Sequence, residues 1–302
     1  MDNKIVKDII RLKKEKKAVL LVHAYQLPEV QEIGDYVGDS LGLCIEAAKT
    51  DARVIVFCGV YFMAESAKIL NPEKTVLLPD KNAGCPMADM AEPEKLRELK
   101  SENPGAVVVC YVNSTAAVKA ESDICCTSSN AEKIIRSIPE EKRIIFVPDR
   151  HLGSFAAERT GRDIILWPGF CPTHQRILPE DILRHKKKHP EAMVLVHPEC
   201  SREVRGLADF VGSTRQIHKK CIEENREKFI IATEQGIIHG LEKETDNKHF
   251  IPASKLAVCP NMKKTNLENI RKSLELNETK ILINSRIMEK ALIPIKRMME
   301  IS

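Results

Sequence analysis

The chain has 302 residues and a formal net charge of +4 at pH 7, with 43% hydrophobic, 30% charged and 4% aromatic residues. This composition is typical of a soluble protein long enough for two or three domains, and no apolar run approaches the roughly 20 residues of a membrane span. The mild charge and the few aromatic residues argue against a nucleic-acid-binding surface. The first 17 residues have the pattern of an amphipathic helix and not of a signal peptide. We therefore expect a cytoplasmic protein that binds neither nucleic acid nor membrane.

The predicted elements that follow this helix repeat three times. Apolar runs that begin at residues 18, 106 and 192 (AVLLVH, AVVVCY and AMVLVH) predict the first strand of each repeat. A helical pattern, a second strand (53–60, 143–149 and 229–236), another helix and a third strand (75–79, 164–168 and 249–252) come next. Unbroken aliphatic runs are typical of strands buried on both faces, and alternation with helices predicts parallel sheets with right-handed crossovers.

The predicted fold class is therefore α/β: three pseudo-threefold-related α/β/α sandwich units, each built on a short parallel sheet, around a central active site. The predicted bounds are 1–87 for the first unit, 88–173 for the second and 174–261 for the third. The tail, 262–302, contains two further helical patterns around a short apolar run. We expect this tail to complete the first unit by packing back onto it, beside the N-terminal helix.

Each unit ends in a Cys-Pro pair, at Cys85, Cys171 and Cys259, separated by 86 and 88 residues. In a reducing compartment, the 10 cysteines should be core residues, metal ligands or nucleophiles and not disulfides. Threefold symmetry would bring these three thiols together, and thiolates select zinc, copper(I) or iron–sulfur clusters. A 4Fe–4S cluster on three cysteines would keep one iron open. The spacing alone leaves a second interpretation, three buried structural cysteines.

Polar side chains recur at two further points of the repeat. His23, Tyr111 and His197 follow the apolar core of the first strand, and Ser40, Ser128 and Thr214 precede the next helical pattern. Ligands bind beyond the carboxyl ends of parallel strands, and helix N-termini attract anions. The sequence thus predicts a central cavity for a substrate with several carboxylates or phosphates. Plain N-capping is the alternative role for the three hydroxyl groups.

The segments HAYQLPEVQEIGDYVGDSL, WPGFCPTH, VHPEC and VCPNMKK together resemble the quinolinate synthase family of NAD biosynthesis, over essentially the whole chain. The resemblance implies one 4Fe–4S cluster, on Cys85, Cys171 and Cys259, with one open iron that acts as a Lewis acid. It also implies a condensing transferase with dehydration steps, which joins iminoaspartate to dihydroxyacetone phosphate and releases quinolinate, phosphate and two waters. A functional link to an aspartate oxidase or aspartate dehydrogenase would supply the first substrate.

The resemblance further implies roles for individual residues. Tyr25, Glu199 and His197 would transfer protons. The residues implied to bind substrate are His23, Ser40, Tyr111, Asn113, Ser128, His197, Glu199 and Thr214. His174 should lie near the cluster without an assigned role, and the other seven cysteines should be small core residues. Two other functions stay open: a hydro-lyase for a dicarboxylate, and an iron or redox sensor, for which no segment supplies a DNA- or protein-binding module.

Overall fold

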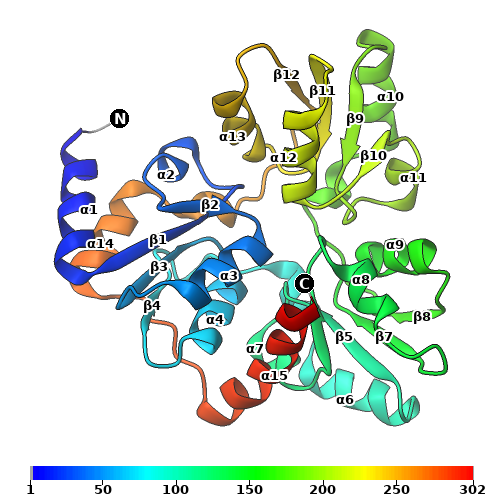
Figure 1. The fold of residues 1–302 in the computed structure, drawn as a ribbon, viewed down its shortest axis with the longest axis horizontal. Coiled ribbons are helices and arrows are strands. Elements are labelled where there is room, and N and C mark those ends of the chain that lie inside the picture. Colours follow the sequence, from blue (N-terminus) through cyan, green and yellow to red (C-terminus); the bar gives the residue numbers. More distant parts are fainter. Residues whose placement is uncertain (1–2, 302) are drawn as a thin grey trace.

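The computed structural model describes residues 3–301, which form three four-stranded parallel sheets with the same strand order. The first sheet contains β2 (Tyr36–Gly38), β1 (Ala18–His23), β3 (Val54–Cys58) and β4 (Thr75–Leu77), in this spatial order. The second contains β6 (Ile124–Cys126), β5 (Val107–Tyr111), β7 (Ile144–Val147) and β8 (Ile164–Leu166). The third contains β10 (Phe210–Val211), β9 (Met193–Val196), β11 (Lys228–Ala232) and β12 (His249–Pro252). The predicted α/β class is confirmed (Figure 1).

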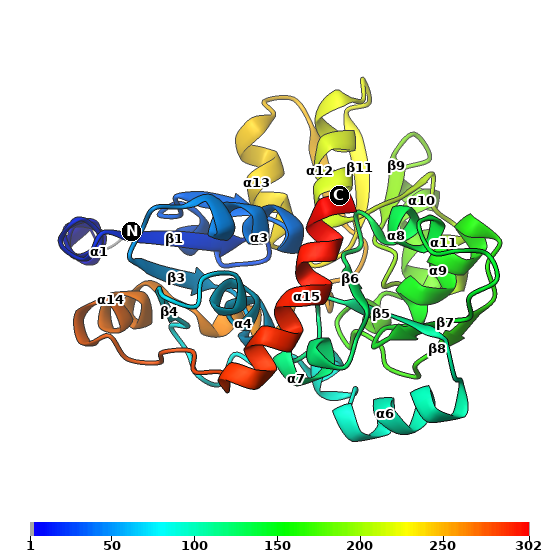
Figure 2. The same ribbon diagram turned by 60° about the horizontal axis from the view of Figure 1, so that its bottom comes forward.

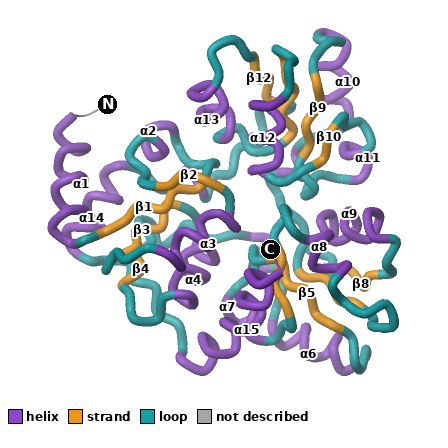
Figure 3. Tube along the Cα trace, viewed as in Figure 1, coloured by secondary structure: helices purple, strands orange, loops and turns teal. Residues whose placement is uncertain are grey.

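Helices flank each sheet, and the three units surround a common centre (Figure 3). Those of the first unit are α1 (Asn3–Lys16), α2 (Pro28–Gln31), α3 (Ser40–Lys49), α4 (Tyr61–Leu70) and α5 (Pro86–Asp89). The second has α6 (Pro93–Glu102), α7 (Ala116–Ala120), α8 (Ala131–Arg136), α9 (Arg150–Thr160) and the 3₁₀ turn η1 (His174–Arg176). The third has α10 (Pro179–Lys188), α11 (Arg202–Arg205), α12 (Thr214–Glu223), α13 (Ile237–Glu244) and η2 (Met262–Lys264). Within residues 3–301, no helix combines the length and the apolarity that a bilayer span needs.

The edge strands β2, β6 and β10 are absent from the sequence-based prediction, which gave three strands to each unit. They are only two or three residues long, too short for a periodic pattern. An aspartate directly before each edge strand fixes it, because the carboxylate accepts a backbone N–H from the neighbouring central strand. The pairs are Asp35 with Leu20 (2.8 Å), Asp123 with Val108 (2.8 Å) and Asp209 with Val194 (2.7 Å). These aspartates have the same spacing as His23, Tyr111 and His197, so the repeat extends to the edge strands.

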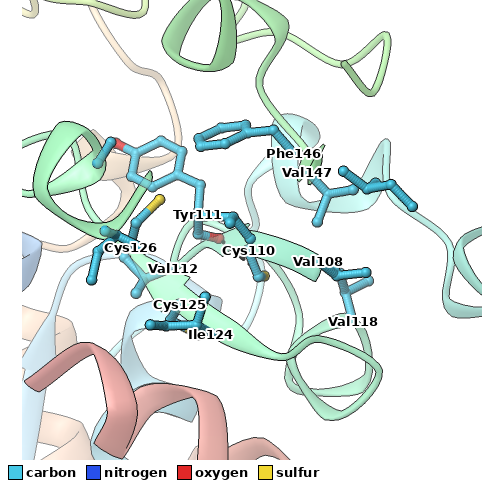
Figure 4. Packing of buried hydrophobic residues seen from close by; sticks show 14 of the residues in the cluster. Val108, Cys110, Tyr111, Val112, Val118, Ile124, Cys125, Cys126, Phe146 and Val147 are labelled. Carbon is cyan, nitrogen blue, oxygen red and sulfur yellow. Dashed lines mark hydrogen bonds between the residues drawn. The ribbon is translucent and has the colours of Figure 1, made fainter. Parts of the chain in front are cut away.

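The strands are apolar because both faces of each sheet are covered. All five residues of β3 are buried, and so are the four of β7. In the second unit, Cys110, Cys125 and Cys126 lie within the core beside Tyr111 and Phe146 (Figure 4). The three thiols are fully buried, in keeping with their predicted role as small core residues.

The C-terminal tail departs in part from the prediction. Helix α14 (Leu267–Leu276) packs on α1 and β3 of the first unit, as expected, and Ile281 then donates its backbone N–H to Val76 (2.9 Å). Helix α15 (Ser285–Ile301), however, packs mainly on α7 and β6 of the second unit (Figure 2). The reason is its apolar face, because Ala291, Ile295 and Met298 are fully buried in the core of that unit. The tail therefore joins two units.

Candidate active site at the junction of the three units

A cavity of about 210 Å³ lies where the carboxyl ends of the three sheets meet, and residues from all three units line it. Every residue that the sequence singled out lines this one cavity. They are His23, Tyr25, Ser40, Cys85, Tyr111, Asn113, Ser128, Cys171, His197, Glu199, Thr214 and Cys259. Sequence reasoning missed the lining residues Asp39, Arg176 and Glu234. A second cavity of about 710 Å³, between the first and third units, shares Asp39 and Thr214 with it.

A repeated backbone hydrogen bond places the three Cys-Pro loops. In each unit, the third residue after β3, β7 or β11 donates its N–H to the carbonyl two residues before the cysteine. The pairs are Tyr61 with Ala83 (2.8 Å), Arg150 with Gly169 (2.9 Å) and Gln235 with Ala257 (3.0 Å). A Cβ at Gly169 would lie 2.4 Å from the Pro148 carbonyl oxygen, so this return of the chain requires glycine. Each loop therefore brings its cysteine to the same point of its unit.

The three thiols fit an iron–sulfur cluster. Cys85, Cys171 and Cys259 are free and partly exposed, unlike the other seven cysteines, which are all buried. Burial is the main cause that raises the pKa of each thiol, that of Cys85 to about 12, and the neighbouring thiols raise the pKa of Cys85 and Cys171 further. Such a set is costly to ionise unless a cation pairs with it, and thiolates prefer soft metals.

Two buried imidazoles at the cavity wall have the same hydrogen-bonding pattern. His23 accepts the backbone N–H of Tyr25 at Nδ1 (3.1 Å), and His197 accepts that of Glu199 at Nδ1 (3.3 Å). Burial lowers the pKa of both imidazoles to about 3, so both are neutral at pH 7. In a neutral imidazole whose Nδ1 accepts, Nε2 carries the proton. Each histidine can therefore donate one hydrogen bond from Nε2.

A continuous chain of hydrogen bonds links the two predicted proton carriers, Glu199 and Tyr25. Glu199 Oε2 lies 2.8 Å from His174 Nδ1, and His174 Nε2 lies 2.9 Å from Thr233 Oγ1. The Tyr25 hydroxyl lies 2.7 Å from both Thr233 Oγ1 and Thr214 Oγ1. Sequence reasoning assigned no role to His174 and missed Thr233. Their signals were only positional, three residues after a Cys-Pro cysteine and one residue after β11.

Glu199 and Tyr25, the two ends of this chain of hydrogen bonds, differ in their acidity. Burial would raise the pKa of Glu199, but the imidazole of His174, aided by His197 and Tyr111, holds it below its usual range. The Tyr111 hydroxyl donates to Glu199 Oε1 at 2.6 Å, and Asn113 Nδ2 lies 3.4 Å from the same oxygen. Burial raises the pKa of Tyr25 well above its usual value. Glu199 is thus a carboxylate and Tyr25 a neutral phenol at pH 7.

The three predicted hydroxyl groups are close to helix starts but do not cap them. Asp39 caps α3 by accepting the Gly42 N–H (2.9 Å), and Ser213 caps α12 by accepting that of Gln216 (3.2 Å). Ser40 and Thr214 are therefore the first helical residues, which corrects the capping interpretation. Ser128 lies three residues before α8, because the turn at 127–130 closes with the Asn130 side chain and delays the helix. All three hydroxyl groups line the cavity.

A second grouping of possible metal ligands overlaps the first. Single ligand atoms of Cys171, His174 and Glu199 lie within 4.8 Å of one another, and His174 Nδ1 is 3.2 Å from the Cys171 sulfur. His174 is already hydrogen-bonded through both ring nitrogens, so a metal there would break the chain to Tyr25.

The sequence of this chain was compared with those of known proteins and protein families. The family model described as "Quinolinate synthetase A protein" matches residues 7–300. This chain belongs to that family. Quinolinate synthases of Dehalococcoides mccartyi (53% identity over 293 residues, 97% of each chain) and Alkaliphilus metalliredigens (52% over 301 residues, 99% of each chain) are among its relatives. Another, from a Geobacter species, is 54% identical over 293 residues, which cover 97% of this chain and 95% of the relative.

The family membership makes the chain an enzyme of the quinolinate synthase type, in NAD biosynthesis, that acts on small molecules. Among solved structures, the E-1-hydroxy-2-methyl-but-2-enyl-4-diphosphate reductase of Plasmodium falciparum matches 91% of this chain and 94% of its own. Its sequence identity is 13% and its TM-score 0.32, values too low for any argument about fold or function.

Proposed function

We propose that the chain condenses iminoaspartate with dihydroxyacetone phosphate to form quinolinate, phosphate and two waters. The observation that carries this proposal is the meeting, in one cavity, of three thiols suited to an iron–sulfur cluster and the hydrogen-bonded chain from Glu199 to Tyr25. A condensation followed by dehydrations needs proton transfer at several atoms, together with a group that weakens C–O bonds. The protein would therefore be a condensing transferase.

The cavity has many hydrogen-bond donors for an anionic substrate. His23 and His197 offer Nε2–H, and Ser40 and Ser128 offer hydroxyl groups at the wall. Asn113 Oδ1 is buried without a hydrogen-bond partner among the described residues, which suits a substrate N–H or O–H group. Iminoaspartate has two carboxylates and the triose one phosphate, so together they match a wall of this kind.

We propose that Cys85, Cys171 and Cys259 hold one 4Fe–4S cluster and leave one of its irons open. When bound, the cluster would supply a Lewis acid for a substrate oxygen. Two features of the protein support this ligand set: the same backbone hydrogen bond returns each loop to the centre, and neighbouring thiols of the set raise the pKa of Cys85 and Cys171.

The protein groups would move protons between two points of the cavity. Glu199, a carboxylate at pH 7, would accept protons during enamine attack and ring closure. Tyr25, a neutral phenol, would donate to a leaving hydroxyl group, and His174 and Thr233 would return a proton to it from Glu199. His197, stacked on His174 with ring centroids 4.7 Å apart, would help to orient that imidazole.

A direct test is an anaerobic incubation of the cluster-reconstituted chain with iminoaspartate and dihydroxyacetone phosphate, followed by chromatography of quinolinate and an assay of free phosphate. Both products should appear in equal amounts, and omission of either substrate should abolish both. The hydro-lyase alternative predicts a different outcome. The same preparation would then dehydrate a hydroxy-dicarboxylate when no triose phosphate is present, and it would form no quinolinate. If an aspartate oxidase or dehydrogenase supplies the iminoaspartate, aspartate plus that enzyme should replace it.

Removal of the wall hydroxyl groups should weaken substrate binding without loss of the cluster. Ser40→Ala, Ser128→Ala and Thr214→Ala each delete a donor to a charged group, which costs about 1.5–3 kcal/mol of binding free energy. Calorimetric titration with a dicarboxylate analogue would measure this effect, with iron content as a control. Ser213→Ala, which removes a helix cap, is the matched variant and should change thermal stability more than affinity. Unchanged affinity in all three wall variants would contradict the role.

A further inference from the structure

The strand registers identify three equivalent positions, one in each unit, beside the Cys-Pro loops. Val22 pairs with Cys58, Cys110 with Val147 and Val196 with Ala232, so these pairs correspond across the three sheets. Two residues after Cys58, Val147 and Ala232, which end β3, β7 and β11, the chain reaches Val60, Asp149 and Glu234. In each unit, the next residue donates the backbone hydrogen bond that pins the Cys-Pro loop. Two of the three positions therefore hold a carboxylate, and both carboxylates are fully buried.

Glu234 connects directly to the loop of the third cysteine. Its Oε1 accepts the backbone N–H of Cys259 at 3.1 Å and lies 3.0 Å from the ammonium group of Lys263, which is in the turn η2 that follows this loop. Its Oε2 accepts the N–H of Gly236 at 2.6 Å. Lys263 also donates to the carbonyl of Tyr25, so this network ties the Cys259 loop to the strand end that carries the predicted acid.

Asp149 occupies the same position beside the loop of the second cysteine. Its Oδ1 accepts the N–H of Leu152 at 2.7 Å, whereas its Oδ2 is buried and has no hydrogen-bond partner within residues 3–301. Burial and the charge of Glu199 raise its pKa, and the backbone N–H groups of Leu152, His151 and Cys171 oppose that rise. Asp149 also forms an isolated parallel β-bridge with Gly169, two residues before Cys171, so its carboxylate lies at the start of that loop with one oxygen still available.

We propose that Asp149 and Glu234 are positioning residues that hold the backbone of the Cys171 and Cys259 loops so that both thiols face the cluster, an inference that rests on the proposed cluster. Their charge alone would not help, because a carboxylate near a thiolate opposes its ionisation. For Glu234 the useful contact is the hydrogen bond to the Cys259 amide, and Lys263 offsets its charge. The Asp149 Oδ2, which has no partner within residues 3–301, would serve the Cys171 loop in the same way. The first unit has Val60 instead, so the Cys85 loop depends on its backbone hydrogen bond alone at this position.

The anchoring can be measured without any cluster, by hydrogen exchange of the apo chain. Glu234→Ala should speed amide exchange in residues 257–263 by about tenfold or more, while β11 keeps its protection. Glu234→Gln keeps an oxygen for the Cys259 amide and should restore most of the protection. Glu65→Ala is the matched control, since Glu65 is also buried and accepts a backbone N–H from Ala116 (2.9 Å), a residue of α7 and not of a Cys-Pro loop.

The effect on the cluster is measured by the rate at which a chelator removes iron from the reconstituted chain. Glu234→Ala and Asp149→Ala should release iron about tenfold faster than the native chain. The rate of iron release should stay close to native in Glu234→Gln, Asp149→Asn and Glu65→Ala. Native rates of loop exchange and iron release in both alanine variants would overturn the proposal. If the native chain bound no cluster, the proposed cofactor would fail, whereas the exchange experiment would still decide whether the carboxylates anchor the loops.

Discussion

Cys171→Ala should abolish the visible charge-transfer absorbance that we expect anaerobic reconstitution with iron and sulfide to give the native chain, and with it all quinolinate formation. The expected loss is complete because a cubane on three cysteines has no spare protein ligand. Cys85→Ala and Cys259→Ala should behave in the same way, since the repeated backbone hydrogen bond gives all three loops equivalent positions. Absorbance spectra and iron and sulfide analysis measure the outcome.

Two comparisons make this result specific. Cys58→Ala and Cys221→Ala remove thiols that are fully buried in the cores, so these variants should keep the cluster. The competing metal site at Cys171, His174 and Glu199 needs neither Cys85 nor Cys259. Retention of bound iron in Cys85→Ala, together with its loss in His174→Ala, would therefore favour that site over the three-cysteine cluster.

Tyr25→Phe and Glu199→Gln should each lower kcat by about 10²–10⁴-fold, the usual worth of a positioned acid or base. Tyr25→Phe keeps the ring but removes the proton that Thr233 and Thr214 hold in place. Glu199→Gln keeps the shape but removes the carboxylate that His174 contacts at 2.8 Å. Steady-state rates under anaerobic conditions give the effect, and rapid quench should detect an intermediate that accumulates on the enzyme.

The cluster spectrum and the affinity for a product analogue should stay near native in both variants, because other residues supply the thiols and most donors. Glu203→Gln, at an exposed position four residues after Glu199, should retain the native rate. Thr233→Ser should keep activity, whereas Thr233→Val should lose it, if the hydroxyl group passes a proton between His174 and Tyr25. Near-native turnover in Tyr25→Phe and Glu199→Gln together would mean that other groups carry the protons.

The repeat made the fold predictable from the sequence. Equal spacing of the Cys-Pro pairs and of His23, Tyr111 and His197 implied three like units, and like units place like residues at one centre. That argument needs no knowledge of side-chain contacts, which explains why all the predicted site residues line the same cavity. Their individual roles stay predictions.

Features outside the repeat, or defined by contacts between units, could not be predicted in this way. Helix α15 has no counterpart in the other units, and its amphipathic pattern does not specify which core it covers. His174 and Thr233 are 59 residues apart in the sequence, so only the tertiary structure shows that they join Glu199 to Tyr25. The carboxylates of Asp149 and Glu234 became equivalent only through the strand registers.

The central claim is that three repeated Cys-Pro loops hold one cluster whose open iron faces the substrate cavity. Mössbauer spectroscopy of the chain reconstituted with isotopically enriched iron tests it most directly, with spectra recorded before and after addition of quinolinate. The expected result is a 4Fe–4S spectrum in which a single iron site changes its parameters when quinolinate binds, since only that iron lacks a cysteine. A spectrum of another metal centre, or four iron sites that all remain unchanged with quinolinate bound, would contradict the claim.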